Sequence, residues 1–188
     1  MSTVAVMAGG KSSRMGRDKL LVDLNGETLV ARAVREFGGA FDTVLLSVAG
    51  SKKYDVPAEP VEDVFKGCGP LGGLHAVLLR TEDEGVFLVA ADMPFATAEA
   101  ALKVVSACGG AEICVPVWDD GRVEPLFAYY KKELAARAEK LLREGRRSMR
   151  SLLEVSRVAT VPAAPLGEAR LLENVNTPED LARAFPAK

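Results

Sequence analysis

The sequence is poor in the residues that most often build metal centres and disulfide frameworks. It contains one histidine and three cysteines among its 188 residues. With His75 alone, a histidine-based metal site is not available, and its place in a predicted helix favours a structural role. Cys68, Cys108 and Cys114 are odd in number and widely spaced, which excludes a regular disulfide framework and a CxxC metal knuckle. We expect three buried or partly buried free thiols.

Long apolar runs and a charge excess of one sign are also missing. No apolar stretch approaches the roughly 20 residues that a membrane span requires. Lysine and arginine total 24 against 26 acidic residues, which excludes the broad basic surface of a duplex nucleic-acid binder. A small basic pocket for one phosphorylated ligand remains compatible with this balance. Without a secretory signal at the N-terminus, we expect a cytoplasmic protein with neither a membrane nor a nucleic acid as partner.

Short apolar runs alternate with helical patterns along the chain, whose length suits one domain. Strands are predicted at Thr3–Ala8, Thr43–Val48, Val86–Asp92, Glu112–Val117, Leu126–Tyr130 and, at an edge, Arg157–Pro162. Helices are predicted at Thr28–Gly38, Pro70–Thr81, Thr97–Cys108, Lys131–Gly145 and Ser148–Val155, and a last one starts at Thr177 as N-cap. This alternation predicts an α/β fold with a mostly parallel sheet and helices on both faces.

The segment "MAGGKSSRMGRDK" directly follows the first predicted strand, where parallel sheets bind their ligands. It matches neither GxGxxG nor GxxxxGK[ST], so both common phosphate-loop motifs are excluded by spacing. Gly9 and Gly10 nevertheless allow backbone N–H groups to approach an anion. Arg14 and Lys19 add positive charge suited to phosphate. The alternative is a solvated glycine-rich turn that carries two unrelated cations.

This segment resembles the signature LAGGxSxRMGxDK of nucleotidyltransferases of the molybdenum cofactor guanylyltransferase type. Four further blocks resemble that family in the same order, namely "EDVFKGCGPLGGL", "VAADMP", "RVEPLFAYY" and "NVNTPEDL". Together they cover nearly the whole chain. The resemblance implies one Rossmann-like domain over residues 1–188, of the nucleotide-diphospho-sugar transferase type.

The resemblance implies a Mg²⁺-dependent enzyme that joins GTP to the phosphate of molybdopterin and releases pyrophosphate. Its catalytic residues would be Arg14 and Lys19, which neutralise the β- and γ-phosphates, and Asp92, which holds Mg²⁺. Asp63 would contact the nucleoside, and the segment from Met7 would line guanine and ribose. The nucleotide-binding set implied in this way is Met7, Ala8, Gly9, Gly10, Lys19, Ser47, Asp63, Gly72 and Asp92.

The resemblance also implies residues on the acceptor side. Asn174 and Asn176 would lie near the pterin or complete the site. Arg146 and Arg147, in "REGRRSMR", are candidates to receive the pterin phosphate or an acidic protein that delivers or accepts the cofactor. The alternatives are turn and capping roles for the asparagines and a solvated basic helix end for the arginines.

Other residues of the set also have simpler interpretations. Asp92 can cap a helix that begins in "MPFATAE", Asp63 can be a surface carboxylate, and "GPLGG" can be a tight helix entry. The sequence departs from the family at Ser47, where asparagine is frequent, and at Glu124, where histidine or glutamine is frequent. The second departure puts a pterin-side contact in doubt.

Three other functions compete with the GTP-dependent one. A CTP-dependent relative carries AAG in place of the AGG of Ala8, Gly9 and Gly10, a one-methyl difference that a pocket discriminates by about 1 to 3 kcal/mol. A sugar-phosphate nucleotidyltransferase would be longer and lack the NTPEDL ending. A non-catalytic nucleotide-binding protein is disfavoured because Lys19 and Asp92 are intact.

Overall fold

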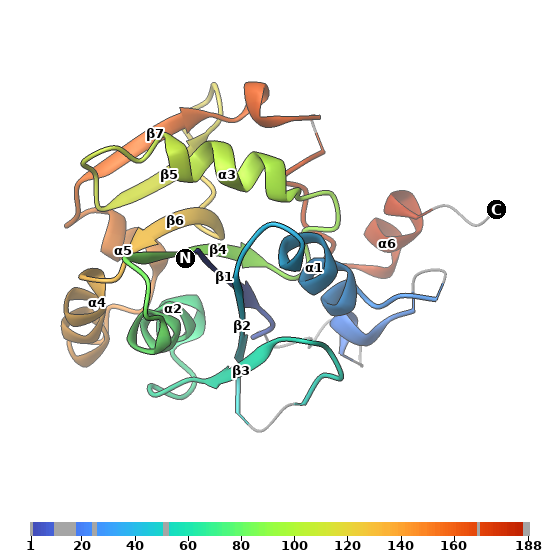
Figure 1. Ribbon diagram of the computed structural model, residues 1–188, viewed down its shortest axis with the longest axis horizontal. Coiled ribbons are helices and arrows are strands. Elements are labelled where there is room, and N and C mark those ends of the chain that lie inside the picture. Colours follow the sequence, from blue (N-terminus) through green and yellow to red (C-terminus); the bar gives the residue numbers. More distant parts are fainter. Residues whose placement is uncertain (1, 10–17, 24–25, 51–52, 169, 186–188) are drawn as a thin grey trace.

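The computed structural model describes residues 2–9, 18–23, 26–50, 53–168 and 170–185. These residues form one seven-stranded sheet in the order β3-β2-β1-β4-β6-β5-β7, with helices on both faces (Figure 1). The strands are β1 (Thr3–Met7), β2 (Thr43–Val48), β3 (Glu59–Glu62), β4 (Gly85–Ala90), β5 (Ile113–Val117), β6 (Phe127–Lys131) and β7 (Val158–Pro162). The helices are α1 (Leu29–Gly38), α2 (Gly69–Arg80), α3 (Ala98–Ser106), α4 (Leu134–Arg143), α5 (Met149–Leu153) and α6 (Pro178–Ala184), with 3-10 turns η1 (Lys19–Leu21) and η2 (Ala164–Leu166).

The sheet is mostly parallel, as predicted. Parallel pairs join β1 to β2 and β4, β2 to β3, and β5 to β7, whereas β6 runs antiparallel to β4 and β5. The connection from Val117 to Phe127 is too short to hold a crossover helix, so the chain returns in the opposite direction.

Strand β3 is the element that the sequence pattern did not predict. Its four residues, Glu59–Glu62, contain one buried apolar side chain, that of Val61, and include Pro60. β3 pairs only with β2 and therefore forms an edge of the sheet. An edge strand tolerates proline and polar residues, which explains why it lacks the apolar run of the inner strands.

Two apolar layers enclose the sheet because successive side chains of a strand point to opposite faces. Val4 and Val6 of β1 belong to the layer beneath α1 and α3. Ala5 and Met7 belong to the layer beneath α2, α4 and α5. The inner strands are thus covered on both sides, which accounts for their uninterrupted apolar sequences.

Threonine side chains cap several helices at their first turn. The Thr97 hydroxyl accepts a hydrogen bond from Ala100 N at 3.3 Å. Thr177 accepts one from Asp180 N at 3.1 Å, and the Asp180 carboxylate accepts one from Thr177 N at 2.9 Å. The predicted N-cap at Thr177 is therefore confirmed as a complete capping box, and Thr97 caps the helix that was predicted to begin with it.

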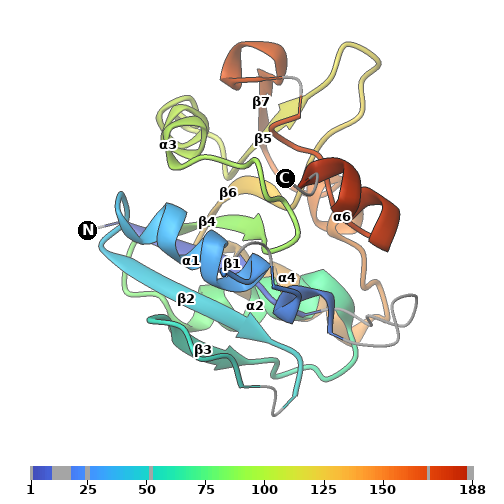
Figure 2. The same ribbon diagram turned by 90° about the vertical axis from the view of Figure 1, so that its right-hand side faces the viewer.

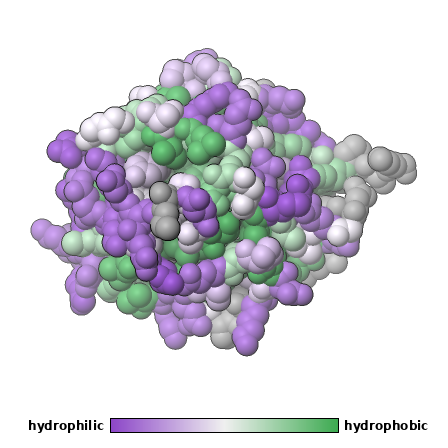
Figure 3. All heavy atoms as spheres, viewed as in Figure 1, coloured by the Kyte–Doolittle hydropathy of each residue, from purple (hydrophilic) through white to green (hydrophobic). Residues whose placement is uncertain are grey.

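The predictions for the cysteines and for the burial of His75 in a helix agree with the structure. All three cysteines are free and buried, and His75 is buried in α2 with 1% of its surface exposed. Among the described residues, no helix combines the length and apolar character needed to cross a membrane. Figure 3 shows mainly hydrophilic side chains on the face seen in Figure 1, interrupted by smaller apolar areas.

Candidate functional site

The carboxyl ends of β1, β2 and β4 meet at one edge of the sheet. Met7 pairs with Ser47 of β2 on one side and with Ala90 of β4 on the other. Beyond this pair, Ala8 N donates a hydrogen bond to the Ser47 carbonyl at 2.9 Å. Figure 2 shows β1 and β2 side by side, with α6 lying toward their carboxyl ends. The structure therefore brings Met7, Ala8 and Ser47 of the predicted set together at this edge.

The glycine-rich segment is described only at its two ends. Gly9 is exposed and has room for a side chain, since a Cβ there would lie 3.7 Å from the Cβ of Ala49. Gly10 and Arg14, both predicted to bind the nucleotide, lie outside the described residues. The chain is described again from Asp18, which begins the turn that carries Lys19.

Lys19 joins two distant parts of the chain at this edge. Its Nζ lies 2.5 Å from the carboxylate of Asp92, which follows β4. The same ammonium donates to the Val175 carbonyl at 3.1 Å and to Asn176 Oδ1 at 2.9 Å. The Lys19 and Asp92 side chains are 17% and 19% exposed. Three of the predicted site residues, Lys19, Asp92 and Asn176, thus form one partly buried cluster.

The segment before α6 is fixed against the end of β4. Val175 N donates to the Asp92 carbonyl at 2.8 Å, and the Val175 side chain is buried. Asn176 N donates to the Asp180 carboxylate at 3.0 Å, which extends the α6 capping box by one residue. Asn174 is half-buried in the same segment. These contacts hold Asn176 where its amide oxygen meets Lys19.

The start of α2 packs closely on the ends of β1 and β2. A Cβ on Gly73 would lie 2.5 Å from both Met7 Cε and Ser47 Oγ. A Cβ on Gly72 would lie 3.0 Å from the Phe65 carbonyl oxygen and 3.9 Å from Asp63 Oδ2. Glycine at position 73 lets α2 approach β1 and β2, and glycine at position 72 lets it approach the connection that carries half-buried Asp63. Burial raises the pKa of Asp63 above its ordinary value.

Glu124 supplies a second carboxylate near Asp92. Glu124 Oε1 accepts a hydrogen bond from Leu126 N at 3.0 Å. Burial raises the pKa of Glu124, and the negative charge of Asp92 raises it further. Glu124, which the sequence indicated only as a departure from the family, is therefore close enough to Asp92 for their charges to interact.

The two arginines predicted for the acceptor side lie elsewhere. Arg146 pairs with Glu154 at 3.2 Å, and Arg147 is exposed between α4 and α5. Figure 1 shows these two helices at one side of the molecule and α6, which follows Asn176, at the other. The structure does not bring Arg146 and Arg147 next to the Lys19 cluster, and their role stays a prediction.

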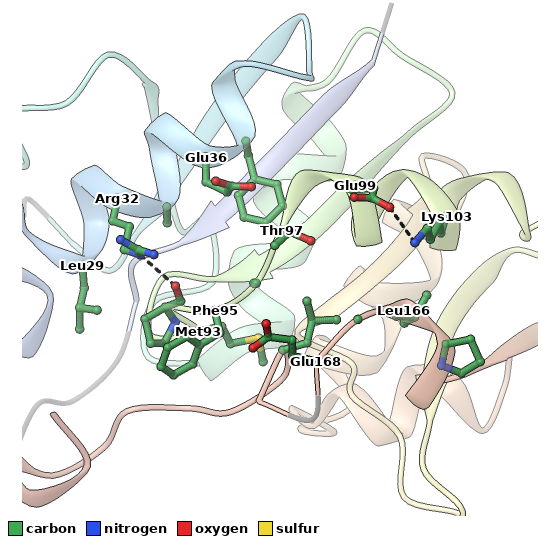
Figure 4. Close-up of a pocket in the computed structure, with 17 residues that line it drawn as sticks. Leu29, Arg32, Glu36, Met93, Phe95, Thr97, Glu99, Lys103, Leu166 and Glu168 are labelled. Carbon is green, nitrogen blue, oxygen red and sulfur yellow. Dashed lines mark hydrogen bonds and ion pairs between the residues drawn. The ribbon is translucent and has the colours of Figure 1, made fainter. Parts of the chain in front are cut away.

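A hollow of about 410 Å³ lies between α1, α3 and the segment around η2 (Figure 4). Arg32 Nε donates to the Pro94 carbonyl there at 2.9 Å, and Glu99 pairs with Lys103 at 2.8 Å. Of the predicted site residues that the structure describes, none lines this hollow. Its charged residues are of both signs, and neither Lys19 nor Asp92 is among the residues that line it, so the hollow is separate from the carboxyl-edge site.

Several residues at the site were not predicted from the sequence. Gly73 lies in the "GPLGG" motif, but the sequence did not predict it as a site residue. Two adjacent glycines are nevertheless typical of close packing. Asp18 precedes Lys19 in the signature segment, and its carboxylate accepts a hydrogen bond from the Tyr54 hydroxyl at 2.9 Å. Tyr54 lies between β2 and β3 and carries no local sequence signal, because only the fold brings it to Asp18.

The fold and a family match together place the chain in a class of enzyme, the nucleotidyltransferases. In fold, the chain is similar to the crystal structure of 2-C-methyl-D-erythritol 4-phosphate cytidylyltransferase from Thermus thermophilus. The TM-score is 0.75 at 18% identity, over 98% of each chain. Residues 4–161 match the family model of the MobA-like NTP transferase domain. The chain belongs to this family and is an enzyme of the nucleotidyltransferase class.

Two relatives are similar over nearly the full length of both chains. A protein of Opitutus terrae, named "Probable molybdenum cofactor guanylyltransferase", is 38% identical over 95% of this chain and 92% of its own. The crystal structure of molybdopterin-guanine dinucleotide biosynthesis protein A from Archaeoglobus fulgidus has a TM-score of 0.84 at 30% identity. That match covers 97% of this chain and 96% of the other.

Proposed function

We propose that the enzyme transfers GMP from GTP to the terminal phosphate of molybdopterin and releases pyrophosphate. The observation that carries this proposal is the cluster of Lys19, Asp92 and Asn176, within which the Lys19 ammonium contacts both side chains. It joins three separate sequence blocks, and each of them resembles the guanylyltransferase family. The names of the two relatives support the same substrates.

The reaction requires two anions to meet. A phosphate oxygen of the acceptor attacks the α-phosphorus of GTP, a new P–O bond forms, and the bond to the pyrophosphate leaving group breaks. No protein nucleophile is required because the attacking phosphate is already ionised. Positive charge and in-line placement therefore supply most of the rate enhancement. Lys19 provides this charge, with Arg14 of the same segment as the second proposed cation.

Asp92 has the chemistry of a Mg²⁺ ligand. Among the described residues, no three histidine, cysteine or acidic side chains gather into a metal-binding group. The partly exposed Asp92 carboxylate, with Glu124 nearby, fits Mg²⁺, which commonly takes one or two carboxylates and completes its shell with phosphate oxygens and water. When bound there, Mg²⁺ would neutralise charge on the reacting phosphates. We propose Asp92 as its protein ligand.

Lys19 must exchange partners when a triphosphate binds. An ammonium group has three N–H donors, and those of Lys19 face Asp92, the Val175 carbonyl and Asn176. A phosphate oxygen therefore replaces at least one of these acceptors. Because Asn176 and Val175 precede α6, nucleotide binding and the position of this segment are linked.

The acceptor side of the site is assigned to the segment before α6. Of the predicted acceptor-side residues, Asn176 contacts Lys19, and Asn174 lies two residues before Asn176. Arg146 and Arg147 remain candidates for an acidic protein that delivers or accepts the cofactor, since Arg147 is exposed beyond α4. The cytoplasmic location and the single domain over residues 1–188 are part of the same proposal.

The choice of nucleotide is tested by thermal unfolding with GTP, CTP or ATP, each with and without Mg²⁺. We expect selective stabilisation by GTP, because a ligand at 100 times its Kd adds about 2.7 kcal/mol. Selective stabilisation by CTP would instead identify a cytidylyltransferase. Equal effects of all three nucleotides would move the assignment to the broader superfamily.

The reaction itself is tested by pyrophosphate release from GTP. Release that depends on added molybdopterin is the expected result. Release with a sugar phosphate but not with molybdopterin would contradict the proposal, as would nucleotide binding without any turnover. The last outcome would identify a non-catalytic nucleotide-binding protein.

A further inference from the structure

Tyr54 brings together three segments next to the nucleotide site. It lies in the connection between β2 and β3, and its half-buried ring packs against the apolar layer beneath α1. Its hydroxyl lies 2.9 Å from Asp18 Oδ2 and 3.3 Å from the Ala8 carbonyl oxygen. Ala8 directly follows β1, and Asp18 directly precedes Lys19. One hydroxyl thus contacts the chain on both sides of the glycine-rich segment.

Asp18 uses its two carboxylate oxygens for different contacts. Oδ1 accepts a hydrogen bond from Leu20 N at 3.2 Å and so caps η1, the turn that carries Lys19. Oδ2 accepts the bond from Tyr54. The side chain of Leu20 is buried in the same layer as Ala8. The orientation of η1 is therefore tied to Tyr54 through a single carboxylate.

We propose that Tyr54 is a positioning residue of the nucleotide site. Its single hydroxyl proton is shared between the Asp18 carboxylate at 2.9 Å and the more distant Ala8 carbonyl, which holds Asp18 beside Ala8. Through Asp18, Tyr54 sets the turn from which Lys19 reaches Asp92. This inference rests on the proposed function, because it assigns Tyr54 to the site that binds the triphosphate. Tyr54 acts through Ala8 and Asp18 and need not touch the nucleotide.

The chemistry of the phenol suits this role. Burial and the bond to the Asp18 carboxylate raise the pKa of Tyr54, so the hydroxyl stays protonated and remains a donor across the physiological range. A hydrogen bond to a charged acceptor is roughly twice as strong as one between neutral groups. The ring fills space, but only the hydroxyl reaches Ala8 and Asp18, so removal of the oxygen alone separates the two contributions.

The decisive variant is Tyr54→Phe, which keeps the ring and removes the hydroxyl. The matched control is Tyr129→Phe, the same change at a half-buried tyrosine whose hydroxyl lies against Gly85, at the amino-terminal end of β4 and away from the carboxyl ends of the strands. We expect Tyr54→Phe to weaken GTP binding roughly tenfold in calorimetric titrations with Mg²⁺, as loss of a hydrogen bond to a charged group predicts. The KM for the acceptor should stay unchanged, and Tyr129→Phe should bind GTP like the wild type.

A second measurement does not depend on nucleotide binding. The sequence between Ala8 and Asp18 contains trypsin sites after Lys11, Arg14 and Arg17. In the nucleotide-free protein, Tyr54→Phe should raise the rate of cleavage at these sites several-fold relative to the wild type and to Tyr129→Phe. Cleavage elsewhere in the chain serves as the internal standard for global unfolding.

The Asp18→Asn variant provides the coupling test. If Tyr54 acts through Asp18, the double variant Tyr54→Phe/Asp18→Asn binds GTP no more weakly than the poorer single variant. Additive losses would overturn the proposal, as would wild-type GTP affinity or wild-type cleavage in Tyr54→Phe. If the wild-type protein itself does not bind GTP, the proposed function fails, and the cleavage rates alone then decide whether Tyr54 fixes Ala8 and Asp18.

Discussion

At the candidate site, Lys19 contacts groups from two other segments of the chain. It faces Asp92 after β4 and Asn176 before α6, which lie 73 and 157 positions away in the sequence. Two of its three acceptors are side chains that also have proposed roles with the metal or the acceptor. A change at either partner therefore alters both the charge and the position of the Lys19 ammonium.

The first prediction concerns Asp92→Asn. Asparagine keeps the size of the side chain and one acceptor for Lys19, but it removes the charge proposed to hold Mg²⁺. We expect pyrophosphate release to fall roughly 10²- to 10³-fold, the range for loss of one electrostatic contact in a catalytic site. Thermal unfolding should show a folded protein. Glu99→Gln, an exposed change on α3, is the control, and retained turnover at low Mg²⁺ in Asp92→Asn would contradict the metal assignment.

A second residue-scale prediction concerns His75. It is 1% exposed, and neither ring nitrogen has a hydrogen-bond partner among the described residues. Burial lowers its pKa below the ordinary 6.5, while Glu139 and Arg143 of α4 act in opposite directions. His75 therefore binds a proton more readily in the unfolded chain than in the folded protein. As a result, the free energy of unfolding falls as the pH drops below about 6.5.

The variant His75→Leu should remove this pH dependence. We expect it to be as stable as the wild type or more stable at pH 8, because an unpaired buried polar group costs about 1 to 3 kcal/mol. Its advantage should grow at pH 5. Denaturant unfolding at both pH values measures the effect, and His75 is the only histidine of the chain. An equal pH response in the two proteins would show that His75 does not titrate in this way.

At the scale of elements, the position of α2 depends on Gly73, because glycine has no side chain. Gly73 allows the helix to rest on Met7 and Ser47 at the ends of β1 and β2. The same contact brings the start of α2 to the predicted nucleotide site, where Asp63 lies beside Gly72. The "GPLGG" motif is therefore a tight helix entry, and its place in the nucleotide site stays a prediction.

Gly73→Ala should disturb both stability and nucleotide binding. The added methyl would lie 2.5 Å from Met7 Cε and Ser47 Oγ, so Met7 must repack or α2 must shift. We expect a loss of about 1 to 3 kcal/mol in the free energy of unfolding, together with weaker GTP binding. Gly110→Ala is the control, since a Cβ there meets nothing within 4 Å. Wild-type behaviour of Gly73→Ala would show that α2 can move without consequence.

At the scale of the whole molecule, the two apolar layers share the same strands. Alternate residues of β1 and β4 enter opposite layers, so neither layer can form without the sheet. We expect one cooperative unfolding transition for the chain, as for a single domain. Fluorescence of Trp118, the only tryptophan, reports the layer beneath α1 and α3 and should give the same midpoint as far-UV circular dichroism. Two separate midpoints would contradict the single domain.

Much of this fold follows from local sequence pattern. The inner strands were predictable because both faces are covered, and the N-caps Thr97 and Thr177 because their hydroxyls act within one turn. β3 was not predictable, since an edge strand needs little apolar sequence. The antiparallel direction of β6 depends on the length of a connection rather than on a residue type.

The sequence by itself determined the alternation of strands and helices, the segment that carries Lys19 and the carboxylate at the end of β4. These features depend on neighbouring residues and on motifs. The tertiary structure decided that Lys19 meets Asn176, that Tyr54 contacts both Ala8 and Asp18, and that Arg146 lies apart from the site. Such contacts join residues far apart in sequence, and their distances exist only after the sheet has set the order of its strands.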